Sequence, residues 1–338
     1  MIAPSFPAEV AEPAPLHRSR TLSSREHTAL LLDVARRYYL EEQGQAEIAA
    51  EVNFSRATVS RLLSEARRRG IVQIRVSHPL ERVVGIERAL VKAFGLKQVR
   101  VADPSDPSAS PAEIAQCAAD LLIECSSENV LLSVSNGAAV TATVDAMPQL
   151  VWPRSRVVQM IGSVGDSNLI LDSPETCRRM ARRLGGSFHP LPAPLVVASP
   201  MVAQALRSDN QIATTLELGA RADIALVGVG AMTDGHSGHI LQAYENAELA
   251  QDIVRMGGVA HICGHHISAT GEHLATELCA RTIAVDLERL HQIPLVIGVA
   301  WGEPKVVALL AALRGGHLSG LVTDRATAIR LLEPVASH

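Results

Sequence analysis

The stretch QAEIAAEVNFSRATVSRLLSEARRRG, residues 45–70, decides how the first part of the chain folds. QAEIAAEV predicts a short helix, Asn53 suits a backbone with positive φ, and Ser55 is a good N-cap for a further helix that ends at Gly70. Upstream, HTALLLDVARRYYLEEQ spaces its apolar residues as an amphipathic helix does. The pattern therefore predicts a domain of three helices over residues 25–78.

A helix-turn-helix counted from Gln45 assigns apolar residues to the positions that must be buried, which are Ile48, Ala49, Val52, Phe54, Val59 and Leu62. The exposed side of its second helix carries hydroxyl and guanidinium groups, which suit phosphate oxygens and guanine edges in a major groove. We predict DNA contacts from Ser55, Arg56, Ala57, Thr58, Ser60 and Arg61. IVQIRV at 71–76 alternates like a strand, as the wing of a winged helix-turn-helix would. One alternative is an ordinary solvated amphipathic helix, and another is that the first 76 residues form a helical bundle that binds another protein.

Composition separates this segment from the rest of the chain. The 338 residues favour two domains, and 47% hydrophobic with only 3% aromatic residues predicts an aliphatic core. The net charge is −4, yet residues 17–76 hold eleven arginines against seven acids, so this part is basic and the remainder acidic. Residues 1–24 are expected to be a flexible tail without a secretory signal. Five scattered cysteines and no apolar run near 20 residues favour a cytoplasmic protein without a membrane span.

Beyond residue 78, continuous apolar runs alternate with helical segments, as in IPLVIGVA followed by KVVALLAALRGG. This alternation predicts a doubly wound, mostly parallel α/β domain over residues 79–335. Nearly every strand-like run ends in small residues, namely SNGAA, GSVG, GVGAM, CGHH and WGEPK. Because the carboxyl ends of parallel strands form the ligand crevice of such sheets, we predict a binding site where these loops converge.

Several of these segments resemble one family. NFSRATVSRLLSEARRRGIVQIRV is similar to the DNA-binding segment of the SorC/DeoR-type sugar-binding transcriptional regulators. SVSNGAAV, VVQMIGSVG, ADIALVGVG and LVIGVAWGEPKVVALLAALRGGHLSGLVTD resemble their effector domain in order and spacing. The resemblance implies an effector domain related to sugar-phosphate isomerases and deaminases but without turnover. It also implies a homo-oligomer, commonly a tetramer, that binds an operator in double-stranded DNA and responds to a sugar, polyol or sugar phosphate.

Lys305 is one of only three lysines among 31 basic residues, and the resemblance implies that it contacts the effector. With the glycine-rich loops it completes the predicted effector site: Ser135, Asn136, Gly137, Gly162, Ser163, Gly228, Gly230, His265 and Lys305. At Asn136–Ala139 the family usually carries a bulky aromatic residue and an Arg-Thr pair, so the side chains expected to hold a phosphate are missing here. Likewise, the family usually carries an acidic residue in place of His261.

HICGHHISATGEH, residues 261–273, could suggest a metal site. Its spacing matches no closed zinc motif, and alternation along a strand would direct the side chains to opposite faces. We therefore expect neither a metal nor another cofactor. The rival to a regulator is a sugar-phosphate isomerase or deaminase with an appended DNA-binding module, which needs a base such as Asp234, His265 or Asp286 in the crevice. His236 and His239 lie with Asp234 in a glycine-rich loop that pairs no nucleophile with a base, so we expect no enzyme.

Overall fold

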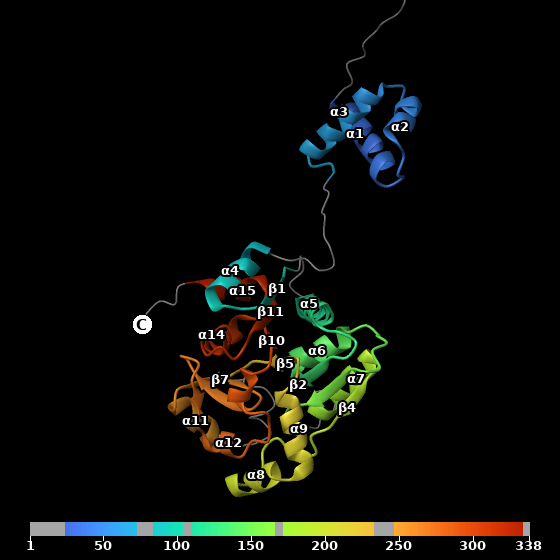
Figure 1. Cartoon of the computed structure of the whole chain (residues 1–338). Helices are drawn as coiled ribbons and strands as arrows, with labels where there is room; N and C mark the ends of the chain where they lie inside the picture. The colour runs from blue at the N-terminus through green and yellow to red at the C-terminus, as the bar shows by residue number, and fades with distance from the viewer. Residues whose placement is uncertain (1–23, 73–83, 104–109, 166–171, 233–246, 334–338) are drawn as a thin grey trace, which may run out of the picture. The chain divides into compact units, whose positions relative to one another are not determined.

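The computed structural model describes residues 24–72, 84–103, 110–165, 172–232 and 247–333 (Figure 1). The chain divides into two compact units, Met1–Val76 and Ser77–His338. The expected tail at 1–24 lies almost wholly outside the described residues. So do most of the expected wing at 71–76 and the segment with Asp234, His236 and His239. Within the described residues, no helix is long and apolar enough to cross a membrane.

The first unit contains helices α1 (Ser24–Tyr39), α2 (Gln45–Glu51) and α3 (Arg56–Arg68), as the periodicity predicts. Asn53 has φ 60° between α2 and α3, and the Ser55 side chain caps α3 by accepting from the Thr58 amide at 3.1 Å. Gly70 follows α3 with φ 72°. These helices share an apolar core made of Leu31, Val34, Ala35, Ile48, Ala49, Val59, Leu62, Leu63 and Ala66.

The prediction that Phe54 is buried is wrong, because 41% of this residue is exposed. Its amide donates to the carbonyl of Ala49 at 3.0 Å and thereby closes the end of α2. That bond holds Phe54 in the turn, and the core positions between the helices are taken by residues such as Leu31 and Leu63 instead. Val52, also predicted in the core, is half-buried and packs against it.

The second unit is built on a seven-stranded sheet in which every pair is parallel, in the order β1-β11-β10-β5-β2-β3-β4. This confirms the predicted mostly parallel α/β fold. Its strands are β1 (Gln98–Ala102), β2 (Leu131–Val134), β3 (Arg156–Gln159), β4 (Ser187–His189), β5 (Ile224–Gly228), β10 (Leu295–Val299) and β11 (Gly320–Asp324). Most are buried on both faces, which explains their continuous apolar runs.

Helices cover both faces of this sheet (Figure 1). One core contains residues from α5 (Ser110–Cys125), α6 (Ala138–Ala146) and α7 (Ser173–Leu184). The opposite core contains residues from α4, α9, α11, α14 and α15, which span Val84–Phe94, Asn210–Ala220, Ala247–Arg255, Val306–Arg314 and Arg325–Leu332. Alternation along β10 divides its side chains between them, since Val296 belongs to the second core and Ile297 to the first. α8 (Pro200–Arg207) packs beside α9.

The second unit also contains an antiparallel sheet, which the sequence pattern does not predict. Its order is β6-β7-β8-β9, with β6 (Gly230–Ala231), β7 (Gly258–Ile262), β8 (His265–Ser268) and β9 (His273–Leu274). Cys263 and Gly264 have φ values of 53° and 83°, so they form the tight two-residue turn that makes β7 and β8 a hairpin. GVAHICG is therefore not a strand of the parallel sheet.

TIAVDL, which reads as a strand, makes only isolated bridges from Thr282 and Ala284. The short helices α12 (Glu277–Ala280) and α13 (Leu287–Leu290) flank this segment, and a 3-10 turn, η2 (Glu303–Lys305), precedes α14.

Candidate functional site

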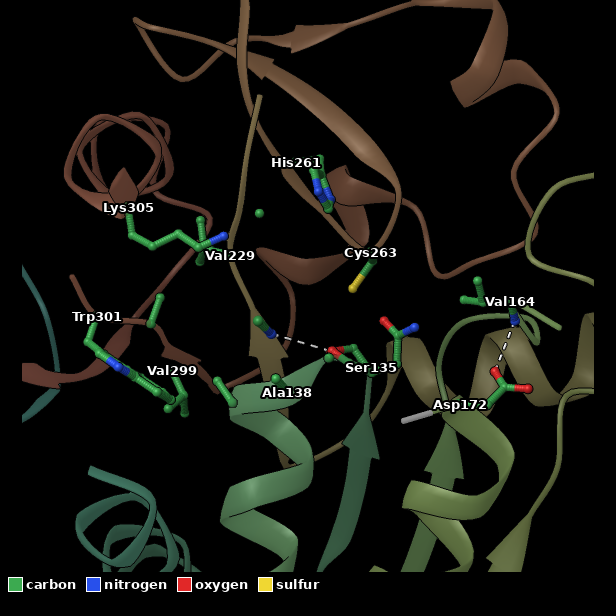
Figure 2. Close-up of a pocket in the computed structure, with 16 residues that line it drawn as sticks. Ser135, Ala138, Val164, Asp172, Val229, His261, Cys263, Val299, Trp301 and Lys305 are labelled. Atoms are coloured by element: carbon green, nitrogen blue, oxygen red, sulfur yellow. Dashed lines mark hydrogen bonds between the residues drawn. The ribbon is translucent and has the colours of Figure 1, made fainter. Parts of the chain in front are cut away.

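A cavity of about 360 Å³ opens at the carboxyl ends of β2, β5 and β10 (Figure 2). The chain builds the sheet in two directions: β2, β3 and β4 extend to one side, whereas β5, β10 and β11 extend to the other. The reversal falls between the paired neighbours β2 and β5, and open α/β sheets bind ligands at such a switch point. The volume lies within the range of small-molecule sites, so the fold itself positions a ligand pocket here.

Six of the nine predicted effector residues line this cavity: Ser135, Asn136, Gly137, Gly228, Gly230 and Lys305. Ser135 joins two of the loops, because its hydroxyl accepts a 3.4 Å hydrogen bond from the Gly228 amide (Figure 2). Gly137 is the N-cap of α6 with φ 115°, a conformation that side chains rarely adopt. The first amides of α6 therefore lie at the cavity, where they favour an anion or an electronegative oxygen.

Lys305 reaches the cavity from the end of η2, directly before α14 (Figure 2). It is half-buried, and this desolvation lowers the pKa of its ammonium group below the usual 10.5. A cation in such surroundings can offer a strong hydrogen bond or charge contact to a ligand oxygen.

The other three predicted effector residues do not line the cavity. Gly162 is packed against the chain at Pro194–Leu195, where a Cβ would lie 2.5 Å from the Leu195 nitrogen, so its small size serves packing. The hydroxyl of Ser163 donates to the carboxylate of Asp172. His265 faces away from the cavity, toward His273 and Cys279.

Residues that sequence reasoning missed make up the rest of the lining, and most are apolar: Ala138, Ala139, Val164, Asp172, Val229, His261, Cys263, Val299, Ala300 and Trp301. Asp172 is buried and caps α7, accepting from the amides of Val164 and Ser173 at 2.9 and 2.8 Å. The Asp-Ser-Pro-Glu run at 172–175 is a recognisable helix start that could have indicated this carboxylate. The half-buried Trp301 adds a large aromatic surface to the lining.

Two of the three candidate bases of an enzyme, His265 and Asp286, do not line this cavity. Asp286 pairs with Arg207 at 2.9 Å and is absent from the cavity lining. His265 also lies elsewhere, and Asp234 is outside the described residues. Asp172 does line the cavity, but its carboxylate is occupied by two backbone amides and a hydroxyl.

On α3, five of the six predicted DNA contacts are exposed: Ser55, Arg56, Ala57, Ser60 and Arg61. Thr58 is half-buried, with its hydroxyl 2.9 Å from that of Ser55. Neither Arg56 nor Arg61 forms an ion pair with a carboxylate among the residues that the structure describes. At the other end of the helix, Arg69 pairs with Glu65 at 2.6 Å.

A parallel α/β domain with a pocket at its switch point, joined in the chain to a basic helical unit, is the arrangement expected of a ligand-binding transcriptional regulator. The sugar-binding domain family (Sugar-bind) matches residues 78–333. The chain is 28% identical to the sorbitol operon regulator of Klebsiella pneumoniae over 92% of this chain and 100% of that protein. It is 30% identical to the deoxyribonucleoside regulator of Bacillus subtilis over 91% and 98%.

The crystal structure of full-length sorbitol operon regulator SorC from Klebsiella pneumoniae aligns with a TM-score of 0.71 and 27% identity, covering 90% of this chain and 99% of that one. The chain belongs to the SorC/DeoR-type family of sugar-binding transcriptional regulators. It is accordingly a carbohydrate-related transcriptional regulator and not an enzyme, as the family resemblance of its motifs implies.

Proposed function

We propose that this regulator binds an operator through α3 and changes its operator affinity when a sugar, polyol or sugar phosphate occupies the cavity. The observation that carries the proposal is the cavity itself. It combines helix N-terminal amides, a half-buried lysine and a tryptophan. The first unit of the same chain exposes Arg56 and Arg61 on α3. Relatives carry the names sorbitol operon regulator and erythritol catabolism regulatory protein, which favours a polyol or related effector.

In this proposal α2 and α3 form a helix-turn-helix, and α3 enters the major groove. Ala49 is buried where the two helices meet, Asn53 makes the turn and Ser55 begins the recognition helix. Arg56 and Arg61 supply the strongest contacts, since a guanidinium can bind a guanine edge or a phosphate with two hydrogen bonds. The half-buried Thr58 acts mainly through the Ser55 cap.

The test of DNA binding is a fluorescence-anisotropy titration of the full-length chain against DNA fragments from upstream of its own gene, at several salt concentrations. Arg56→Ala and Arg61→Ala should each weaken binding by about 1–3 kcal/mol if the arginine contacts a base, or reduce the salt slope by about one if it contacts a phosphate. Arg154→Ala, an exposed arginine of the second unit, is the control and should leave binding unchanged. Wild-type affinity and salt slope in both α3 variants would refute the recognition face. No DNA binding even at low salt would favour the protein-binding bundle.

The effector is tested by thermal-shift measurements with sugars, polyols and their phosphates. A ligand that stabilises the wild type should stabilise Lys305→Ala much less. Lys92→Ala removes an exposed lysine of α4 and should respond as the wild type does. A ligand that stabilises Lys305→Ala as much as it stabilises Lys92→Ala would exclude Lys305 from the effector site.

We further propose that the chain forms a cytoplasmic homotetramer, because dimeric and higher assemblies place recognition helices in successive major grooves. Light scattering should then give four times the 36.0 kDa chain mass. A monomer at the concentrations that bind DNA would contradict this assembly.

A further inference from the structure

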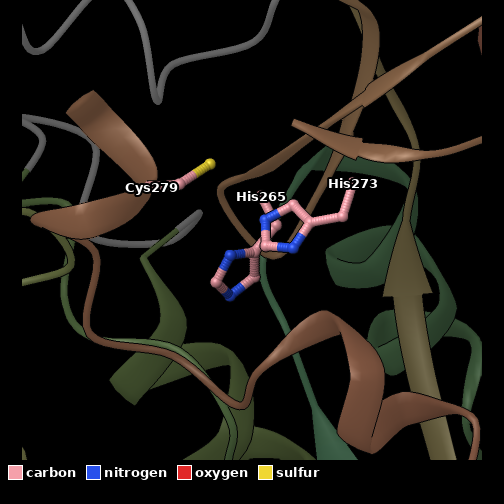
Figure 3. Close-up of side chains that lie close together, drawn as sticks. All are labelled: His265, His273 and Cys279. Atoms are coloured by element: carbon pink, nitrogen blue, oxygen red, sulfur yellow. The ribbon is translucent and has the colours of Figure 1, made fainter. Parts of the chain in front are cut away.

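Two histidines and a cysteine from three different elements lie close together (Figure 3). His265 lies on β8, His273 on β9 and Cys279 on α12. One ligand atom from each, an imidazole nitrogen or the Cys279 Sγ, lies within 4.8 Å of the other two. The expectation that strand alternation separates the side chains of residues 261–273 is wrong for His265 and His273, because His273 comes from β9, which pairs with β8. Cys279 joins them from a helix that lies outside that stretch.

His265 is the most informative member of this cluster. It is only 3% exposed, and both of its ring nitrogens lack a hydrogen bond of normal geometry among the described residues. The Nε2 atom of His273 is in the same state. Buried polar atoms without partners are rare in folded proteins and call for an explanation such as a bound ion.

The surroundings hold these groups in the orientation that a metal requires. Glu288 lies 2.8 Å from Nδ1 of His273, so the lone pair of Nε2 is directed at the cluster. A carboxylate behind a histidine is the usual outer support of a metal-bound imidazole. On the other side, Nδ1 of His266 lies 3.3 Å from the Cys279 sulfur and 3.0 Å from the Thr276 hydroxyl.

The cluster also offers groups that can take up the Cys279 proton when a metal binds. Nδ1 of His266 lies 3.3 Å from the Cys279 sulfur, and imidazole nitrogens of His265 and His273 lie within 4.8 Å of it. The thiolate is the form that binds metals, and metal binding releases the thiol proton. By contrast, burial raises the pKa of Cys177 to about 12, so that thiol stays protonated.

We propose that His265, His273 and Cys279 bind a zinc ion, with a water molecule as the fourth ligand. Imidazole and thiolate together are the donor set that zinc prefers. Zinc bonds of roughly 2.0–2.3 Å separate tetrahedral ligand atoms by roughly 3.3–3.7 Å, so side-chain rotations of about 1 Å would close the cluster around the ion.

Zinc at this position would tie α12 to the paired strands β8 and β9. The turn that precedes β8 contains Cys263, and His261 lies on the preceding strand; both line the effector cavity. The ion would therefore stabilise one wall of that cavity without touching the ligand. The zinc proposal does not depend on which effector the cavity binds.

The test uses untagged full-length protein that has been stripped with a chelator and dialysed. Zinc is then titrated in competition with a chromophoric chelator, and bound metal is measured by mass spectrometry. We expect one zinc per chain and a higher melting temperature with zinc than without it. Cys279→Ala and His273→Gln should weaken zinc binding at least 100-fold, and Glu288→Gln should weaken it about 10–100-fold.

Cys177→Ala and His291→Gln are matched controls, a buried cysteine and an exposed histidine outside the cluster, and should bind zinc as the wild type does. Cobalt provides a readout of the ligands, since its thiolate charge-transfer band should appear in the wild type and His291→Gln but not in Cys279→Ala. Circular dichroism of each stripped variant verifies the fold. A folded wild type that binds no stoichiometric zinc would overturn the proposal, as would wild-type zinc affinity in folded His273→Gln.

Discussion

Replacing Gly230 with alanine should force His261 out of its place in the cavity wall. Gly230 and His261 are partners in the β6–β7 ladder, and a Cβ at residue 230 would overlap the imidazole, with even its Cδ2 atom only 2.5 Å away. The backbone of Gly230 itself is acceptable for alanine, since its φ is outside the left-handed region. The clash with the buried His261 ring is thus the dominant effect.

Overpacking of this kind costs about 1–3 kcal/mol. For a domain of this size that corresponds to a fall in melting temperature of roughly 2–12 °C, measurable by calorimetry of the full-length chain. Gly228→Ala, two residues earlier, is the matched control, because its Cβ would meet its nearest neighbour, the Asn136 carbonyl oxygen, at 3.5 Å. That variant should change the melting temperature little.

A double-mutant cycle separates the clash from other effects of the extra methyl group. In a His261→Ala background, Gly230→Ala should cost much less than it does alone, because the ring that it displaces is gone. An equal cost in both backgrounds would refute the reasoning, and so would a Gly230→Ala protein as stable as the wild type.

Three further predictions concern other parts of the chain. Ser55→Ala removes the α3 cap and should destabilise the first unit by about 1 kcal/mol in thermal unfolding, whereas Ser60→Ala should change it little. Leu63→Ala, at a position only 1% exposed, should cost about 2–5 kcal/mol and abolish DNA binding while the second unit still melts as in the wild type. Because burial lowers the pKa of Lys305, affinity for a phosphorylated ligand should fall with rising pH before pH 10.5 is reached, as the ammonium loses its proton. Lys305→Arg should keep that affinity to higher pH in calorimetric titrations, and a pH-independent affinity of the wild type would contradict the role of its charge.

The parallel sheet and the three N-terminal helices could be predicted because their signals are local. Continuous apolar runs define strands buried on both faces, and Asn53, Ser55 and Gly70 mark the ends of helices by their own chemistry. The site residues in the loops after β2 and β5 could also be predicted, because the carboxyl ends of parallel strands lie at the same edge of a sheet. The burial predicted for Phe54 is wrong because a fixed helix-turn-helix template assigns burial by position. Here a capping hydrogen bond holds that residue in the turn.

The antiparallel sheet and the histidine cluster depend on contacts that spacing does not encode. The two-residue turn at Cys263–Gly264 reverses the chain. The apolar run before CGHH predicts a strand, but it does not predict that a hairpin turn follows it. His273 then reaches His265 through strand pairing, and Cys279 through a four-residue helix. Gly162 shows the converse limit, because a glycine needed for close backbone packing has the same letter as one that admits a ligand.

The position of β1 has a consequence for how the protein is made. β1 pairs along its length with β11, from Gln98 with Gly320 to Ala102 with Asp324, so its partner is translated roughly 220 residues later. The core of the first unit, by contrast, is complete once residue 66 has left the ribosome. A nascent chain therefore carries a finished helical unit long before its sugar-binding sheet can close. During synthesis, the segment proposed to bind DNA exists for a time without the domain proposed to regulate it.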